Sequence, residues 1–254
     1  MVLAKTHIFS GALGECVTCS VLLPQPWDLT PGRKAPVLWL LHGVHGNYES
    51  WLKSSNIARY AERFGLAVVM PSARNSFYTD MAYGGRYYTF ITQELPKTLG
   101  TLFNLSSRRE DNFIAGLSMG GAGSLMLGLS RPEQYAAIGC LSAGFLTVQD
   151  VGEENAHAWA LAYGDAPVEG TYKDCAANAR HIVEAGLPLP RIYHACGTED
   201  FLLPCARRTR DFFAGLSAFD YRYFEGPGAH NWDFWDVQIQ RFLAFLHLPD
   251  IARQ

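Results

Sequence analysis

The sequence predicts an α/β fold with a mainly parallel central sheet that is covered by helices on both faces. Strand-like and helix-like segments alternate along most of its 254 residues, and several strand-like segments are apolar without a break. Such runs are typical of strands buried on both faces, and parallel neighbours need crossover helices between them. No internal repeat or low-complexity spacer divides the chain, so we expect residues 1–254 to form a single domain.

The N-terminal part of the chain begins with extended segments. Proline and glycine residues within positions 24–32 separate two predicted strands, Val17–Leu23 and Val37–Leu41. The second strand runs directly into a glycine-rich loop. We then expect one helix over residues 50–64, which ends at a glycine, and a buried strand over residues 66–71.

The remaining elements continue this alternation. An aromatic loop over residues 77–88 precedes a predicted helix over residues 88–103, and a strand over residues 112–115 leads into another helix. Further strands are predicted over residues 135–142, 191–197 and 221–224. A terminal helix would face the sheet with Trp235, Ile239, Phe242, Leu243 and Leu246. We interpret the longer, irregular segment over residues 145–190 as a small insert that forms a lid or a pocket wall.

The composition argues against several classes of partner. A net charge of −3 offers no basic excess that would attract nucleic acid or an anionic membrane surface. No apolar stretch approaches the length needed to span a bilayer, and the first residues lack the features of a secretory signal. We therefore expect a cytoplasmic protein with no nucleic-acid or membrane partner.

The six cysteines are expected to be free thiols, because an intracellular chain of this size does not need disulfides. Cys16 and Cys19 form a CxxC motif. In a strand, however, residues three apart point to opposite faces, and no second CxxC completes a zinc site. The sequence therefore predicts no metal and no cofactor.

The strongest chemical signal is the pentapeptide from Gly116 to Gly120, a GxSxG motif centred on Ser118. It follows a predicted strand and precedes a predicted helix. In that setting a sharp turn lifts the serine above the sheet, and the glycines avoid steric clashes around it. A chance match is the alternative, but the flanking elements and the residues described next favour Ser118 as a nucleophile.

A serine nucleophile needs a histidine base and a carboxylate that orients the histidine. In α/β-hydrolases the acid and then the histidine follow the serine along the chain. His230 lies in a loop after the last predicted strand, whereas His247 ends the terminal helix and is interpreted as structural. Asp200 follows the preceding strand and is the predicted acid, with the adjacent Glu199 as its competitor.

Backbone amides near the serine are expected to stabilise an oxyanion. Met119, the residue after the nucleophile, supplies one predicted donor, and Val44 in the glycine-rich loop is preferred over Gly43 for the other. His42 and His45 lie in the same loop. We interpret both as hydrogen-bonding residues that fix the loop rather than as a metal pair.

Aromatic residues near these motifs are candidates for substrate contacts. Trp51, Tyr78 and Trp232 are the predicted contacts, and packing in the core is the alternative for each. The aromatic loop that contains Tyr78 is expected either to line an acyl or alcohol pocket or to pack against the body of the protein.

The assembled motifs resemble the esterase D-like family of esterases over most of the chain. The resemblance rests on Leu40 to Asn47, Gly116 to Ser124, Gly197 to Asp200 and His230 to Trp232, and it is nearest to the tributyrin or acetyl esterase branch. It implies a cofactor-free α/β-hydrolase that cleaves short acyl esters. Ser118, Asp200 and His230 match the family triad, and Val44 and Met119 match its oxyanion donors. Family members often assemble, so a homo-oligomer is compatible with the resemblance.

One related branch, the S-formylglutathione hydrolases, typically has a cysteine in the oxyanion loop and a histidine immediately before the nucleophile. Asn47 and Leu117 stand at those places here. These departures make a thioesterase a less favoured interpretation, but they do not exclude it. Feruloyl or carbohydrate esterases and mycolyl-type acyltransferases share the serine motif, and a non-catalytic binding module is a remote alternative.

The sequence thus predicts a serine carboxylesterase that hydrolyses acetyl to butyryl esters through an acyl-enzyme. Its expected partner is a small-molecule ester.

Overall fold

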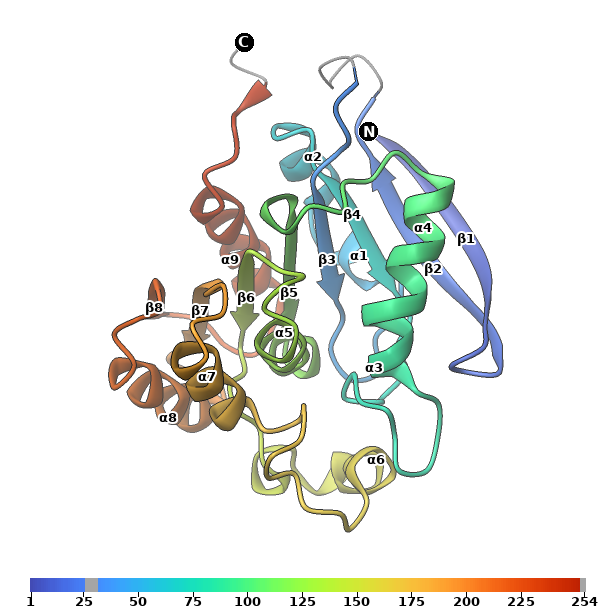
Figure 1. Ribbon diagram of the computed structural model, residues 1–254. Coiled ribbons are helices and arrows are strands. Elements are labelled where there is room, and N and C mark those ends of the chain that lie inside the picture. Colours follow the sequence, from blue (N-terminus) through green and yellow to red (C-terminus); the bar gives the residue numbers. More distant parts are fainter. Residues whose placement is uncertain (26–31, 252–254) are drawn as a thin grey trace.

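Eight strands form one sheet in the computed structural model, which describes residues 1–25 and 32–251 (Figure 1). Their order across the sheet is β1-β2-β4-β3-β5-β6-β7-β8. β1, β2 and β4 pair antiparallel, whereas the pairs from β4 across to β8 are all parallel. The predicted mainly parallel sheet is confirmed. The strands are β1 Val2–Ser10, β2 Glu15–Leu23, β3 Val37–Leu41, β4 Ala67–Pro71, β5 Asn112–Leu117, β6 Ala137–Leu141, β7 Arg191–Gly197 and β8 Tyr221–Gly226.

Helices cover both faces of this sheet. Figure 1 shows α4, α5 and α7 in front of the strands and α9 behind them. A π-helical segment, Phe90–Glu94, joins α3 to α4. The α-helices are α1 Ser50–Ser54, α2 Ile57–Glu62, α3 Tyr87–Thr89, α4 Leu95–Leu102, α5 Met119–Ser130, α6 Glu153–Tyr163, α7 Cys175–Glu184, α8 Leu203–Ala214 and α9 Trp232–Phe245.

The apolar strands supply two cores, one on each face. In β3, Val37, Trp39 and Leu41 pack with the helices of the front face, while Leu38 and Leu40 pack with α1, α2 and α9 behind. All five side chains are almost completely buried. A strand that feeds two cores must be apolar at every position, which is why its sequence shows no alternation.

The prediction of one continuous helix over residues 50–64 is wrong, because the helix is interrupted between α1 and α2. Ser55 Oγ donates to the Trp51 carbonyl at 2.6 Å, and the Asn56 amide donates to Asp236 of α9 at 3.0 Å. Side-chain hydrogen bonds of this kind compete with the regular helical pattern. The break turns α2 to pack against α9.

Several other boundaries differ from the sequence expectations. The edge strand β1 and the helix α8 are additional elements. β1 pairs with β2 along its whole length, from Val2 opposite Leu23 to Ser10 opposite Glu15, so its stability comes from that pairing rather than from its own weak apolar pattern. The 145–190 segment contains α6 and α7, so its predicted irregularity is wrong. Part of the predicted proline turn, residues 26–31, lies outside the described residues.

The carboxyl ends of the parallel strands meet at one edge of the sheet. In Figure 1 this edge lies at the bottom, with α6 beyond it, while the N-terminus lies at the opposite end of the molecule. Ser118, Asp200 and the loop before α9 all follow strands at this lower edge. The topology therefore brings together segments that are distant in sequence.

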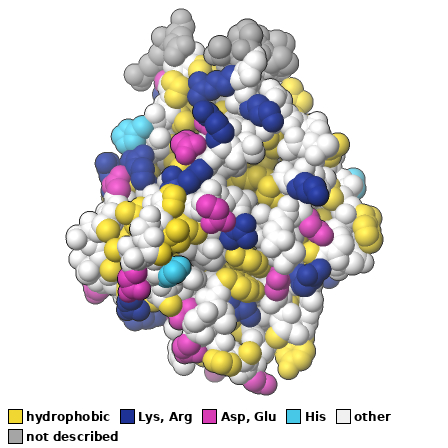
Figure 2. Space-filling model, viewed as in Figure 1, with side chains coloured by type: hydrophobic (Ala, Val, Ile, Leu, Met, Phe, Trp, Pro, Cys, Tyr) yellow, Lys and Arg dark blue, Asp and Glu magenta, His cyan; other side chains and the backbone are white. Residues whose placement is uncertain are grey.

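The surface and the cysteines add three observations. Charged side chains of both signs are scattered over the face seen in Figure 2. Within residues 1–25 and 32–251, no helix has the length and apolar character to cross a membrane. All six cysteines are free; Cys16 is exposed and Cys19 is buried, as expected for opposite faces of β2.

Candidate active site

Ser118 occupies a strained turn between β5 and α5. Its φ of 54° and ψ of −123° are rare for a residue with a side chain, and its amide donates to the Leu141 carbonyl of β6 at 2.9 Å. The flanking glycines are sterically required. A Cβ on Gly116 would lie 2.4 Å from the Gly120 oxygen, and a Cβ on Gly120 would lie 2.6 Å from the His42 oxygen. The predicted nucleophile turn is therefore present in the structure.

The structure brings Asp200 and His230 into direct contact. His230 Nδ1 lies 3.0 Å from both carboxylate oxygens of Asp200, whose side chain is fully buried, while that of His230 is 17% exposed. Glu199 takes a different position. Its carboxylate accepts a hydrogen bond from the Gly228 amide at 2.6 Å and so holds the loop that carries His230. Asp200, and not Glu199, faces the histidine.

A buried network orients the Asp200 carboxylate. Trp235 Nε1 donates to Ser142 Oγ at 2.8 Å, and because that oxygen accepts, the Ser142 hydroxyl is free to donate to Asp200. The Leu202 amide donates to the same carboxylate at 2.8 Å. Burial raises the pKa of Asp200, but the hydrogen bonds from His230, Ser142 and Leu202 outweigh it, so the pKa lies below its ordinary value.

The ionised carboxylate determines which nitrogen of His230 carries the proton. A carboxylate only accepts hydrogen bonds, so Nδ1 must donate to Asp200. In the neutral ring, Nε2 is then left with a lone pair. The ring is further held by Phe201, 4.5 Å away between ring centroids, and by Trp235 at 5.0 Å.

The loop after β3 contains Val44, whose amide is a predicted oxyanion donor, and hydrogen bonds of the His42 ring hold this loop in place. The Nδ1 of His42 donates to the Gly43 carbonyl at 2.7 Å, and its Nε2 accepts from the Ala73 amide at 2.9 Å. One donor and one acceptor require a neutral ring, and burial lowers the pKa of His42 to about 4. The prediction that His42 fixes the loop is confirmed.

His45 differs from this expectation. Its ring is exposed and lines the cavity at Ser118, while its backbone amide, held by Asn75 Oδ1 at 2.8 Å, anchors the loop. Met119 begins α5, and the first amides of a helix have no acceptor inside it. Val44 and Met119 both line the same cavity as Ser118.

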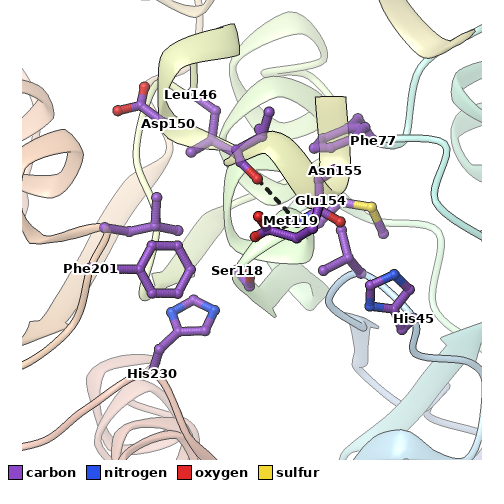
Figure 3. A pocket seen from close by; sticks show the side chains of 13 residues that line it. His45, Phe77, Ser118, Met119, Leu146, Asp150, Glu154, Asn155, Phe201 and His230 are labelled. Carbon is purple, nitrogen blue, oxygen red and sulfur yellow. Dashed lines mark hydrogen bonds between the residues drawn. The ribbon is translucent and has the colours of Figure 1, made fainter. Parts of the chain in front are cut away.

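Two cavities meet at Ser118. The first has a volume of about 240 Å³ and the second about 310 Å³, and Val44, His45, Ser118 and His230 line both. In Figure 3, Phe201 and His230 lie on one side of Ser118, and Phe77 and His45 lie on the other. We call the first one the catalytic cavity. Its lining is completed by Met119, Leu146, Asp150, Val151, Glu154, Asn155 and Leu202.

The three predicted substrate contacts have different outcomes. Trp232 lines the second of these cavities. Tyr78 is completely buried, and its hydroxyl donates to the His42 carbonyl at 2.8 Å, so it helps to hold the loop that carries Val44. Trp51 is 1% exposed, donates to the Leu41 carbonyl and packs edge-on against Trp232. Placing Tyr78 and Trp51 in contact with substrate is therefore wrong, because both belong to the core.

Four contributors to the site were not anticipated as individual residues. Phe201 follows Asp200 directly and is 63% exposed beside His230, and adjacency to the acid was the only signal for it. Ser142 ends the predicted strand 135–142, but nothing in sequence connects it to Asp200. Leu146 and Glu154 lie in the first part of the 145–190 segment, and both line the catalytic cavity.

The described residues contain no group of three or more His, Cys, Asp or Glu side chains that is arranged to hold a metal ion. The polar groups at Ser118 are instead a hydroxyl, an imidazole and a buried carboxylate. That set can relay a proton from a serine to a leaving group.

Comparisons with known proteins identify the family to which this chain is similar. The family model described as "Putative esterase" matches residues 10–246. An acetyl esterase from Caldicellulosiruptor saccharolyticus is 35% identical over an alignment of 260 positions, which covers 94% of this chain and 96% of that protein. More distantly, a diacylglycerol acyltransferase/mycolyltransferase Ag85B from Mycobacterium avium is 26% identical, over 82% of this chain and 73% of that protein.

Two solved structures from Staphylococcus aureus are similar over almost the whole fold. The substrate-bound fluorophosphonate-binding serine hydrolase F has a TM-score of 0.89 and 30% identity, covering 96% of this chain and 98% of that one. The S-formylglutathione hydrolase FrmB has a TM-score of 0.84 and 29% identity, with the same coverage. With its matching family model and its α/β-hydrolase fold, this chain belongs to the putative esterase family and is a carboxylic ester hydrolase.

Proposed function

We propose that this enzyme hydrolyses short-chain acyl esters through an acyl-enzyme on Ser118. The observation that carries the proposal is the bond from His230 Nδ1 to the buried Asp200 carboxylate, beside a serine that lines the same cavity. It leaves Nε2 of His230 as the base for the Ser118 hydroxyl.

The reaction then follows the chemistry of these groups. Ser118 Oγ attacks the ester carbonyl as its proton passes to His230 Nε2, and the amides of Val44 and Met119 stabilise the oxyanion. His230 returns the proton to the alcohol oxygen as the carbonyl carbon–oxygen bond breaks. Water, activated by the same nitrogen, attacks the acyl-enzyme and releases the acid. The Asp200 carboxylate stabilises the imidazolium in both steps.

The size of the catalytic cavity supports the proposal that the substrate carries a short acyl group. Its volume of about 240 Å³ lies below the range of roughly 300–1,000 Å³ that is usual for pockets of drug-sized ligands. Apolar side chains such as Met119, Leu146 and Val151 provide much of its wall. The name of the acetyl esterase relative points in the same direction. A small-molecule ester of an acetyl to butyryl acid is the proposed substrate.

The test is the hydrolysis of p-nitrophenyl esters of increasing acyl length by the wild type and by Ser118→Ala. We expect the substitution to lower kcat by at least about a thousandfold, because the nucleophile is lost. A fluorophosphonate should label only the wild type. The matched control is Ser130→Ala at the other end of the same helix, which should keep both activity and labelling.

Three results would contradict the proposal. Turnover by a folded Ser118→Ala variant would refute the nucleophile, and rates that rise toward long acyl chains would refute the short-acyl preference. Thioester hydrolysis that outcompetes oxygen-ester hydrolysis, measured with S-formylglutathione, would favour the thioesterase alternative.

A further inference from the structure

A separate cavity adjoins the catalytic cavity. It has a volume of about 240 Å³ and lies between α5 and the segment that leads into α7. We call it the rear cavity. Phe77 and Leu146 line both it and the catalytic cavity, so these two side chains form a partition between them. The lining of the rear cavity also includes Ala122, Met126, Phe145, Tyr163, Glu169 and Lys173.

The proposed mechanism determines which half of the ester faces this partition. His230 must protonate the departing alcohol, so the alcohol oxygen lies on the side of His230 and Phe201. The acyl group then extends to the other side of Ser118. Figure 3 shows Phe77 on that side, across the cavity from Phe201.

We propose that Leu146 and Phe77 set the acyl-length limit of this enzyme, and that the rear cavity is a latent site for the distal part of a longer acyl chain. This inference rests on the proposed esterase function. In the wild type a chain that grows past Ser118 meets the partition and cannot advance. With a shorter side chain at position 146, the two cavities join and accept additional methylene groups.

The two partition residues are held very differently. Phe77 is 4% exposed, has a φ of 49° and packs edge-on against Trp159 at 5.1 Å between ring centroids. Leu146 is only partly buried and lies in the loop after β6. Removing Phe77 would disturb a packed aromatic cluster and an unusual backbone, whereas shortening Leu146 removes side-chain atoms from a loop. Leu146 is therefore the residue through which the limit can be changed.

Much of the rear cavity can accept methylene groups. Ala122 and Met126 of α5, together with Phe145 and Tyr163, present apolar surface to it. Burial of one methylene contributes about 0.8 kcal/mol, which is about a fourfold change in an equilibrium or rate constant. The charged Lys173 and Glu169 in the lining will limit how far the gain continues.

The test compares kcat/KM for p-nitrophenyl octanoate and p-nitrophenyl acetate, since the leaving group is the same in both. We expect Leu146→Ala to raise the octanoate-to-acetate ratio by about tenfold or more relative to the wild type. The double variant Leu146→Ala/Ala122→Leu fills the rear cavity with a new side chain and should reverse that gain. Val148→Ala, an exposed neighbour that lines neither cavity, is the control and should leave the ratio unchanged.

The outcomes separate this inference from the proposed function. Loss of activity in Ser118→Ala together with an unchanged ratio in Leu146→Ala would overturn the partition and leave the esterase mechanism intact. A gain that persists in the double variant would place the longer chain elsewhere. If Leu146→Ala instead raises kcat/KM for acetate esters of longer alcohols, the assignment of the two sides is wrong. Leu146→Val provides a milder change, with a smaller gain expected, in case the alanine variant does not fold.

Discussion

The floor and the wall of the catalytic cavity are built in different ways. The floor is formed by Ser118, and we include in it the buried residues at strand ends that support it, such as Asp200 and His42; these three residues are 7%, 4% and 1% exposed. The wall comes from the loop after β6 and the start of α6, where Leu146 is partly buried and Glu154 is exposed. In the proposed mechanism the floor supplies the chemistry, and we propose that the wall limits which ester fits.

This difference has a physical origin. A buried polar group without a partner costs roughly 1–3 kcal/mol, so each change in the floor leaves at least one unpaired group. Side-chain hydrogen bonds of His42 hold the loop after β3, and those of Ser142 and Trp235 hold the Asp200 carboxylate in place. The wall makes few such bonds with the floor, so its residues can change with a smaller loss of stability. Substitutions in the two regions should separate accordingly.

The largest effect is expected in the floor, from Asp200→Asn. An amide in place of the carboxylate can donate to His230 Nδ1, which favours the tautomer whose Nε2 carries the proton and cannot act as a base. We expect kcat to fall by about a thousand- to ten-thousandfold, with little change in KM. The measurement is steady-state hydrolysis of p-nitrophenyl acetate. Glu199→Gln is the control, and a comparable loss in that variant would return Glu199 to consideration as the acid.

A second effect concerns the stability of the floor as the pH falls. Burial lowers the pKa of both His42 and His194 to about 4, and each ring is held neutral between a donor and an acceptor. Between about pH 4 and pH 6.5 the unfolded chain binds protons that the folded protein does not bind. The free energy of unfolding should therefore decrease as the pH falls through that window, by up to about 1.4 kcal/mol per pH unit for each histidine.

Urea denaturation between pH 7.5 and pH 4.5 measures this dependence. His194→Gln should show a smaller slope than the wild type, because one of the two buried rings is gone. His157→Gln, which changes an exposed histidine of α6, should keep the wild-type slope. Equal slopes in all three proteins would mean that His194 is not held neutral by burial.

The smallest effect is expected in the wall. Glu154 lines the catalytic cavity, and Oε1 of its carboxylate accepts a hydrogen bond from Asn155 Nδ2 at 3.2 Å. Because no cation pairs with this carboxylate within residues 1–25 and 32–251, we expect its charge to repel an anionic substrate. We expect Glu154→Gln to raise kcat/KM for the p-nitrophenyl monoester of succinic acid by about two- to fivefold relative to the neutral butyrate ester. High salt should remove the difference. An identical gain in Glu153→Gln, whose side chain lines neither cavity, would show a general surface effect instead.

The sequence predicted the elements of the floor because local rules govern them. The strand–GxSxG–helix order around Ser118 follows from the steric needs of a tight turn, and those needs require glycine at Gly116 and Gly120. Unbroken apolar runs identified the parallel strands, because each feeds two cores. The order of serine, acid and histidine, together with the positions of these residues directly after predicted strands, then favoured His230 over His247 and limited the acid to Asp200 or Glu199.

Other features depended on contacts between distant segments. The sequence could not choose firmly between Asp200 and Glu199, because the choice depends on how the β7 and β8 loops approach each other; a Cβ on Gly197 would lie only 2.0 Å from the Gly228 oxygen. Tyr78 was predicted as a substrate contact because an aromatic side chain in a loop looks the same in sequence whether it faces a cavity or a core. The structure shows that the Tyr78 hydroxyl donates to the His42 carbonyl and that the side chain belongs to the core.

By itself, then, the sequence determined the α/β architecture, the nucleophile turn and the candidates for acid and base, because helix and strand periodicity and turn sterics act over a few residues. Only the tertiary structure decided which carboxylate orients His230, which aromatic residues are core, and that Leu146 and Phe77 separate two cavities. These features arise where strand ends and loops that are distant in sequence come together, and the distances between such segments are a property of the whole fold.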